Sequence, residues 1–219
     1  MTKKMTHIKV QIIHPKSYTT KAKHLTEFCV RFSSLFIGQT NTREKPLFQY
    51  MKGLIQAEKG RKNMEHMAEI VPDTDSQSLQ HFISESDWDE REVLNQVATE
   101  ADAQLGGKED SCLIVDESGF AKKGTKSVGV SRQWNGNKGK VDNSQVAVFI
   151  AIASGNRATL IDEQLYLPEV WTDDKQRCLD AGIPEDKIIF KQKQEQALEM
   201  IYQAKNNGIR YNWVGCDGL

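Results

Sequence analysis

Two aspartates far apart in the chain occupy equivalent places in the sequence. Asp116 closes the apolar run 112–115 and stands just before the turn residue Gly119, and Asp217 closes the apolar stretch 211–216. Short apolar runs that stop at a turn signal are typical of buried strands. We expect the two strands to be parallel neighbours, so that both carboxylates emerge at one edge of the sheet, within reach of one ion.

Paired carboxylates at such an edge indicate a particular chemistry. Mg²⁺ and Mn²⁺ prefer oxygen ligands, and two such ions about 4 Å apart can activate a water or a DNA 3′-hydroxyl and stabilise the leaving oxygen. Glu117 is the first candidate for an additional ligand. For Asp116 taken alone, the alternative is that it merely ends its strand and opens the turn to Gly119.

Two other phosphate chemistries fit the same stretch less well. The segment Gly119–Ser127 imitates a phosphate-binding P-loop, but that motif requires Lys directly after its second Gly, and here Thr125 intervenes. An aspartyl-phosphate enzyme would usually have a second Asp two residues after the first, where this sequence has Ser118. A nucleotide-binding enzyme remains a third hypothesis, which protection by Mg-ATP in a melting assay would test.

The composition is that of an ordinary globular protein. The chain has 219 residues, 27% charged and 38% hydrophobic, which is enough for one large or two small domains. No window approaches 18 consecutive apolar residues and the first residues lack a signal-peptide pattern, so we expect no membrane contact. The cysteines at 29, 112, 178 and 216 have no metal-ligand spacing, which argues against zinc and favours the reducing cytoplasm.

The net charge of −1 conceals a strong asymmetry. Residues 1–62 carry 13 Lys/Arg against 3 Asp/Glu, residues 63–118 carry 2 against 15, and residues 119–219 carry 14 against 12. A strongly basic block beside a strongly acidic one indicates a polyanion-binding face and a separate acidic region. Solvated surface is the alternative for each single lysine.

The first half of the chain has helical periodicity. We expect a flexible basic arm over 1–18 and helices over 21–37, from 46, over 64–71, over 76–86 and from 87 to 105. In the helix 76–86, Gln77, Gln80 and His81 face outward. With the turn before it, this helix has the shape of a helix-turn-helix, and a plain helical hairpin is the alternative.

The second half alternates strands and helices. We expect strands over 112–116, 126–134, 143–154, 158–167 and 211–217, and helices over 172–182 and 192–207. The predicted fold class is therefore α/β, with an all-α region over 1–108 and a sheet domain over 109–219.

Several blocks of this half resemble one family in order and spacing. They read VDESGFAKKGTKSVGVSRQW, NSQVAVFIAIAS, LYLPEVWTDD and WVGCD, and they are similar to bacterial insertion-sequence transposases of the DDE superfamily. The resemblance implies a helical DNA-binding region followed by a ribonuclease H-like mixed sheet with flanking helices. It makes Asp116 the first catalytic aspartate and Asp217 the second. The family's third member, a Glu in a Tyr-Arg-Glu-Lys signature, has no counterpart here.

The resemblance implies a cut-and-paste transposase that binds element ends and joins DNA through Mg²⁺ or Mn²⁺ held by Asp116 and Asp217. We expect this chain to be its N-terminal portion, an incomplete ribonuclease H-like domain that neither cuts nor joins DNA and that forms a homodimer or pairs with an intact transposase. The alternative is a non-catalytic DNA-binding remnant or regulator. The candidate phosphate contacts are Lys122, Lys123, Lys126, Arg132, Lys138 and Lys140.

Overall fold

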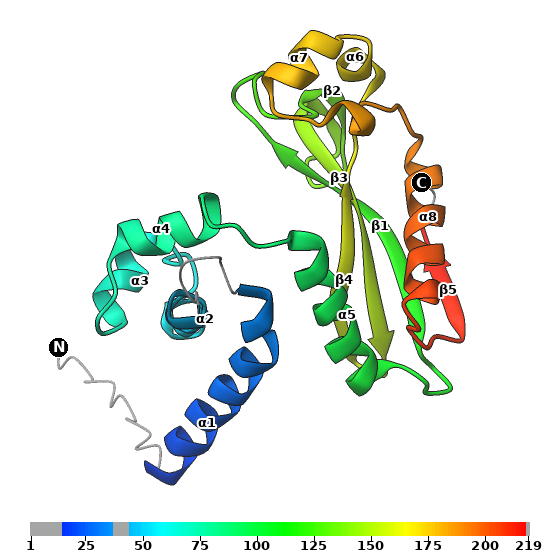
Figure 1. The fold of residues 1–219 in the computed structure, drawn as a ribbon. Coiled ribbons are helices and arrows are strands. Elements are labelled where there is room, and N and C mark those ends of the chain that lie inside the picture. The colour runs from blue at the N-terminus through cyan, green and yellow to red at the C-terminus, as the bar shows by residue number, and fades with distance from the viewer. Residues whose placement is uncertain (1–14, 37–43, 218–219) are drawn as a thin grey trace, which may run out of the picture. The chain divides into compact units, whose positions relative to one another are not determined.

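The computed structural model describes residues 15–36 and 44–217 of the chain. The chain divides into two compact units, Met1–Glu90 and Arg91–Leu219, whose elements are labelled in Figure 1. Most of the expected arm over 1–18 lies outside the described residues, but its end is helical, because the first helix begins at Pro15. Among the described residues, no helix is both long enough and apolar enough to span a membrane.

The described part of the first unit is helical. Its elements are α1 (Pro15–Phe32), the 3-10 turn η1 (Ser33–Phe36), α2 (Glu44–Gln56), α3 (Met64–Ile70) and α4 (Ser76–Ser84). Met67 of α3 and Leu79 of α4 are buried together with Ala57. The Phe82 ring of α4 lies 5.5 Å from that of Phe36, between ring centroids. Most of the apolar side chains that predicted these helices therefore lie on buried faces, but Ile55 of α2 and Ile83 of α4, which were also expected to face inward, are exposed.

A tight turn joins α3 to α4. Asn63 caps α3 by accepting a hydrogen bond from the main-chain N–H of His66, and Asp75 caps α4 by accepting one from that of Ser78. Asp73 has a φ of 54°, the left-handed conformation that such a turn requires. The side-chain amide of Gln49 donates to the Asp73 carbonyl at 2.6 Å and so fixes the turn against α2.

The second unit combines helices with a five-stranded sheet. Its strands are β1 (Cys112–Ala121), β2 (Ser131–Asn135), β3 (Lys140–Ser154), β4 (Arg157–Leu165) and β5 (Trp213–Cys216). Its helical elements are α5 (Glu90–Leu105), α6 (Glu169–Thr172), α7 (Lys175–Asp180), η2 (Glu185–Lys187) and α8 (Lys193–Asn206). This arrangement confirms the expected α/β class, a ribonuclease H-like mixed sheet preceded by helices.

The sheet is mixed, and β3 lies at its centre. One edge of β3 pairs antiparallel with β1, and its other edge pairs antiparallel with β2 and then with β4. A register shift between Ile150 and Ala151 adds a residue to β4. The short strand β5 lies at the outer edge, parallel to β1. The expected parallel pairing of these two strands is thus confirmed.

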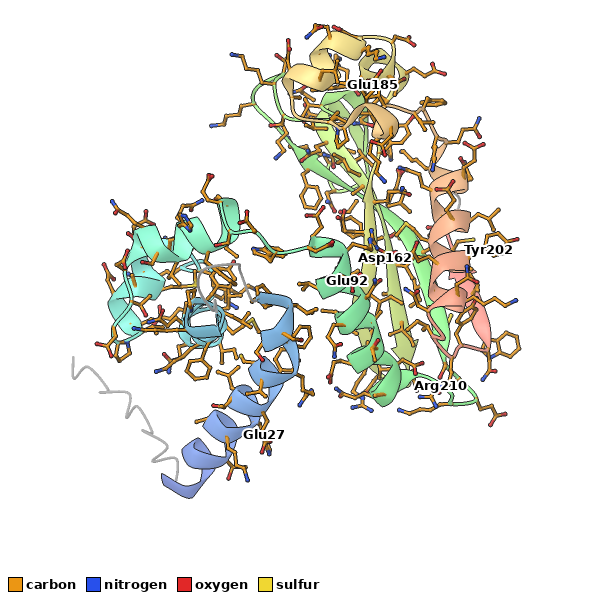
Figure 2. All side chains as sticks on the ribbon, in the orientation of Figure 1. Glu27, Glu92, Asp162, Glu185, Tyr202 and Arg210 are labelled. Atoms are coloured by element: carbon orange, nitrogen blue, oxygen red, sulfur yellow. The ribbon has the colours of Figure 1, made fainter. Side chains whose placement is uncertain are left out.

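One face of the sheet carries the core. Leu113 and Val115 of β1 share this face with Ile150 of β3, and all three are buried. Ala101 of α5 and Met200 of α8 belong to the same cluster, so both helices cover this face. Each large apolar side chain buried in this way contributes about 1.5–3 kcal/mol. Asp162 of β4, labelled in Figure 2, forms an ion pair with Arg91 near the start of α5.

Several sequence-based boundaries were wrong: the expected helix over 172–182 is divided into α6 and α7, and two boundaries of strands near the site also differ. β1 does not end at Asp116 but continues to Ala121, because each residue through Ala121 has a partner in the antiparallel ladder with β3. The expected strand over 126–134 is shortened to β2, since residues 122–130 form a loop. In addition, the apolar residues of α5 are buried against the sheet, so this helix belongs to the second unit and not to the helical unit before it.

Candidate functional site

The register of β1 and β5 brings Asp116 and Asp217 to the same level of the sheet. Val115 and Cys216 are the last paired residues, and each aspartate is the next residue of its chain segment. Residues at one level of two parallel strands project to the same face. Both aspartates are exposed. The two aspartates thus directly follow the last pair of the ladder, and Asp116 projects from the sheet face opposite the core.

Asp116 lies within β1, so strand residues precede and follow it in the chain. Its partner across the antiparallel ladder is Phe149 of β3, and its Oδ1 accepts a hydrogen bond of 2.8 Å from the N–H of Glu117. A turn residue would have more freedom. The continuation of β1 past Asp116 therefore fixes this side chain more firmly than the predicted strand end would.

Glu117 belongs to the other face of the sheet. Adjacent residues of a strand project to opposite sides, and the Glu117 carboxylate forms an ion pair with Lys193 of α8. The Lys193 ammonium also lies 5.2 Å from the ring centroid of Tyr166. Burial, and then the charges of Glu169 and Glu117, raise the pKa of the Tyr166 hydroxyl. Glu117 is thus engaged away from Asp116, which argues against it as the further metal ligand.

The donor set at this edge suits a hard cation. Asp116 and Asp217 offer carboxylate oxygens from neighbouring strands, which Mg²⁺ and Mn²⁺ accept. Within residues 15–36 and 44–217, no cluster of three or more His, Cys, Asp or Glu side chains that could hold a metal is found. The two aspartates are therefore the candidate ligands in the described part of the chain.

The candidate phosphate contacts lie beyond the far end of β1. Lys122, Lys123 and Lys126 are in the loop 122–130, and Arg132 lies on β2, next to that loop. None of these four cations has an ion pair with a described residue. From Asp116 to Ala121, β1 covers about 17 Å at about 3.3 Å per residue. Duplex DNA advances about 3.4 Å along its helix axis per phosphate of one strand, so roughly five base pairs of axis length cover this span.

Lys138 and Lys140 are placed differently. The Lys138 ammonium is 2.7 Å from Asp142 Oδ2, an ion pair across the turn between β2 and β3. The hydrogen bond from Lys138, then that from the N–H of Asn143, and the nearby charges of Lys138 and Lys140 hold the pKa of Asp142 below its usual value. The Asp142 carboxylate therefore partly neutralises these two lysines, which makes them weaker candidates than the other four cations.

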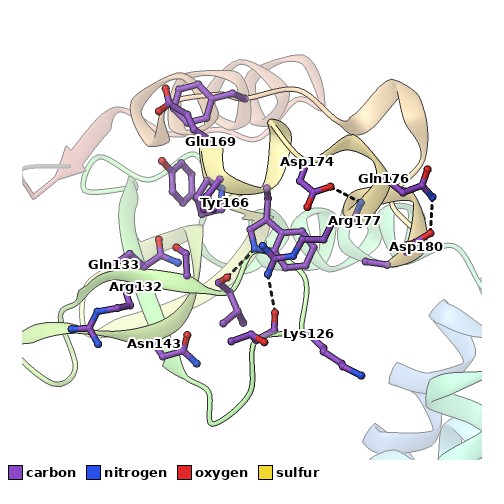
Figure 3. Close-up of a pocket in the computed structure, with 18 residues that line it drawn as sticks. Lys126, Arg132, Gln133, Asn143, Tyr166, Glu169, Asp174, Gln176, Arg177 and Asp180 are labelled. Atoms are coloured by element: carbon purple, nitrogen blue, oxygen red, sulfur yellow. Dashed lines mark hydrogen bonds between the residues drawn. The ribbon is translucent and has the colours of Figure 1, made fainter.

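A pocket that the sequence did not predict adjoins the basic loop. It has a volume of about 1330 Å³ and lies among the loop 122–130, β2, α6 and α7 (Figure 3). The Arg177 guanidinium stacks over the buried Trp171 ring, 3.7 Å from its centroid. The Trp171 indole N–H donates to the Val130 carbonyl at 2.9 Å. The only hint in the sequence was a tryptophan directly before the helix-capping residues 172–174.

The three outward residues predicted on α4 are exposed as expected. Gln77, Gln80 and His81 line a hollow of about 390 Å³, which they share with Glu65 and Glu85. Residues 63–90 contain eight Asp/Glu and no Lys/Arg. The helix, tight turn and helix follow one another as expected, but this surface lacks cations that could hold DNA phosphates.

Comparison with known proteins identifies the family. The model of the DDE superfamily endonuclease family matches residues 31–219. A probable transposase for insertion sequence element IS701 from Microchaete diplosiphon is 32% identical over 209 residues, which cover 95% of this chain and 50% of that protein. The chain thus spans about half the length of this curated relative. No solved structure matches the chain. The chain belongs to the DDE superfamily endonuclease family.

Proposed function

We propose that this chain acts in DNA transposition, with Asp116 and Asp217 as ligands of a catalytic Mg²⁺ or Mn²⁺. The observation that supports this proposal most strongly is the register of β1 and β5, because its last pair, Val115 and Cys216, directly precedes the two aspartates. When bound, the metal would activate a water or a 3′-hydroxyl and stabilise the leaving oxygen of a DNA phosphodiester.

The chain's own residues would hold and orient the DNA. Lys122, Lys123, Lys126 and Arg132 contact backbone phosphates, with Lys138 and Lys140 as weaker contributors. Residues 1–62, with 13 Lys/Arg against 3 Asp/Glu, supply further sequence-independent attraction. Gln77, Gln80 and His81 would contact base edges of the element ends, since they carry side-chain amide and imidazole groups that can read bases.

The metal site can be tested without DNA cleavage. We expect Mn²⁺ to broaden NMR signals near Asp116 and Asp217, and we expect Asp116→Asn and Asp217→Asn each to weaken Mn²⁺ binding about tenfold or more. Asp186→Asn is the matched control, because Asp186 is an exposed carboxylate on η2 of the same unit. Equal Mn²⁺ affinity in all four proteins would refute the metal site.

A non-catalytic role in DNA binding is the second candidate. It is supported by the position of the unpaired cations, which lie beyond the end of β1 and can bind DNA independently of a metal. Mg²⁺ takes six ligands, so two carboxylates alone hold it weakly. We therefore expect the 219-residue chain to bind DNA with element ends but not to nick it, as a homodimer or beside an intact transposase. Metal-dependent nicking that Asp116→Ala abolishes would contradict this expectation.

A further inference from the structure

The loop 122–130 is held by side chains that donate to its main-chain carbonyls. The side-chain amide of Asn143 donates to the carbonyls of both Lys122 and Gly124, each at 2.8 Å. The Arg177 guanidinium donates to the carbonyl of Thr125 at 2.9 Å (Figure 3). The carbonyl groups of Lys122, Gly124 and Thr125 are thus all bound by side chains of the protein.

The end of the loop is held in the same way. The Gln145 side-chain amide donates to the Val128 carbonyl at 2.7 Å, and the Trp171 indole donates to the carbonyl of Val130. Gly129 has a φ of 73°, and a Cβ there would lie 2.8 Å from the Tyr166 carbonyl oxygen, so only glycine fits. These contacts together hold the loop 122–130 in one defined conformation.

This conformation turns main-chain N–H groups outward. In a trans peptide the C=O of one residue and the N–H of the next point in opposite directions. Because the carbonyls of Lys122, Gly124 and Thr125 are bound on the protein side, the N–H groups of Lys123, Thr125 and Lys126 point away from it. None of these three N–H groups donates to another described residue. The residues 123–126 are all exposed.

We propose that residues 122–126 form a preformed site for the phosphates of a DNA backbone. The N–H groups of Lys123, Thr125 and Lys126 donate to phosphate oxygens, and the two lysine ammonium groups add charge. Asn143 and Arg177 are positioning residues, which act by holding the loop. This inference rests on the proposed function for its ligand, since DNA is what supplies a chain of phosphates at this spacing.

Substitutions that leave the net charge unchanged separate the effect of holding the loop in place from the effect of its lysine charges. Asn143→Ala removes two hydrogen bonds to the loop, and Gln145→Leu removes one, without changing the net charge. Asn137→Ala is the matched control, because Asn137 also donates to a main-chain carbonyl, that of Gly119 at 3.1 Å, outside the loop. Circular dichroism and thermal unfolding would verify that each variant is folded. The double substitution Lys123→Ala/Lys126→Ala tests whether the loop contacts DNA at all.

The first measurement is the affinity of the full chain for a duplex with element ends, by fluorescence anisotropy between 50 and 200 mM salt. We expect Asn143→Ala to weaken binding about tenfold and to lower the log–log salt slope by about one to two, since each phosphate contributes about −0.9. Gln145→Leu should act in the same direction, and Asn137→Ala should match the unsubstituted chain. The second measurement is NMR titration with inorganic phosphate, which should shift the amide signals of Lys123, Thr125 and Lys126.

The outcomes distinguish the two proposals. If Lys123→Ala/Lys126→Ala binds DNA with unchanged affinity and slope, DNA contact by this loop is refuted, and so is that part of the proposed function. If that double substitution weakens binding but Asn143→Ala and Gln145→Leu do not, the loop contacts DNA and the preformed site is refuted. Amide shifts caused by inorganic phosphate that persist in Asn143→Ala would also refute the positioning role. Shifts with Mg-ATP but not with inorganic phosphate would point to a nucleotide site instead.

Discussion

Asp102 of α5 binds Arg210 at two points directly before β5. One carboxylate oxygen accepts the main-chain N–H of Arg210 at 2.7 Å, and the other accepts its guanidinium Nε at 2.9 Å. Arg210, labelled in Figure 2, lies in the segment between α8 and β5. The contact joins the end of α5 to the segment that leads to Asp217, and so it helps to fix the position of the second candidate ligand.

Asp102→Ala should destabilise the second unit by about 1–3 kcal/mol, because it leaves the Arg210 N–H without its acceptor. Thermal unfolding measures this loss. Mn²⁺ binding should weaken as well, since β5 would be held less firmly. Glu109→Ala serves as the control, because it removes an exposed carboxylate close to the same turn. Full stability of Asp102→Ala would show that the contact does not position β5.

Glu117→Gln should cost about 1–2 kcal/mol of stability, because it leaves the Lys193 ammonium without its charged partner in a largely buried position. The double variant Glu117→Gln/Lys193→Met should lose less than the sum of the two single losses. Urea unfolding of the four proteins gives this coupling. Mn²⁺ affinity should stay unchanged in Glu117→Gln, and a tenfold fall would make Glu117 a metal ligand after all.

The carboxylate of Asp110 gives a prediction about pH. Hydrogen bonds from the Ser154 hydroxyl at 2.8 Å and from the N–H of Gly155 at 2.6 Å lower its pKa below 3.8. A carboxyl group whose pKa is lowered by folding stabilises the folded state at every pH above its ordinary pKa. This stabilisation is lost as the pH falls through the lowered pKa. Asp110→Asn should therefore unfold at a lower temperature than the unsubstituted chain at pH 6, and the difference should shrink below pH 3.8. A constant difference from pH 6 to pH 2 would contradict this.

The edge strand β5 predicts self-association. Within the described residues it pairs only with β1, and its Trp213 and Val214 are 64% and 46% exposed. An exposed apolar edge is a template for pairing with a second copy. Val214→Lys should shift the chain toward the monomer in light scattering across a concentration series. Leu198→Lys, at an exposed position on α8, should not; equal association of both variants would exclude this edge as the contact.

Two groups of substitutions in the first unit separate phosphate contact from base contact. Lys45 and Lys52 lie on α2, and Lys59 follows it. Replacing all three by alanine should weaken binding to any DNA sequence and lower the salt slope by about three. Gln77→Ala/Gln80→Ala/His81→Ala should reduce only the preference for element ends over unrelated DNA. Competition binding assays with both kinds of duplex measure the two effects. If the second group lowers affinity for all sequences equally, α4 does not read bases.

The pairing of β1 with β5 could be predicted because each strand is a local apolar run and a helix, α8, directly precedes β5. The position at which β1 ends could not be predicted from the sequence. Four of the five residues 117–121 are polar or small, and the segment remains in the strand because β3 supplies a ladder partner for each residue. A pattern within one segment carries no information about the length of its neighbour.

The roles of the two candidate regions were predictable to different degrees. Residue type and strand position suffice to propose Asp116 and Asp217 as ligands, and their metal binding stays a prediction. The shape of the loop 122–130 depends on Asn143 and Arg177, which lie about 20 to 50 positions further along the chain and contact it only after folding. Likewise, nothing in the sequence around Lys138 showed that Asp142 would pair with it.

The anchoring of β5 limits which changes of chain length this region can tolerate. The N–H of Asn212 donates to the Ser111 carbonyl at 2.9 Å, and its side-chain amide donates to the Lys108 carbonyl at 2.7 Å, which sets where β5 begins beside β1. An inserted residue after Asn212 would bring Cys216 level with Asp116 and turn Asp217 to the covered face. Insertion or deletion of one codon within 213–217 therefore removes one carboxylate from the pair.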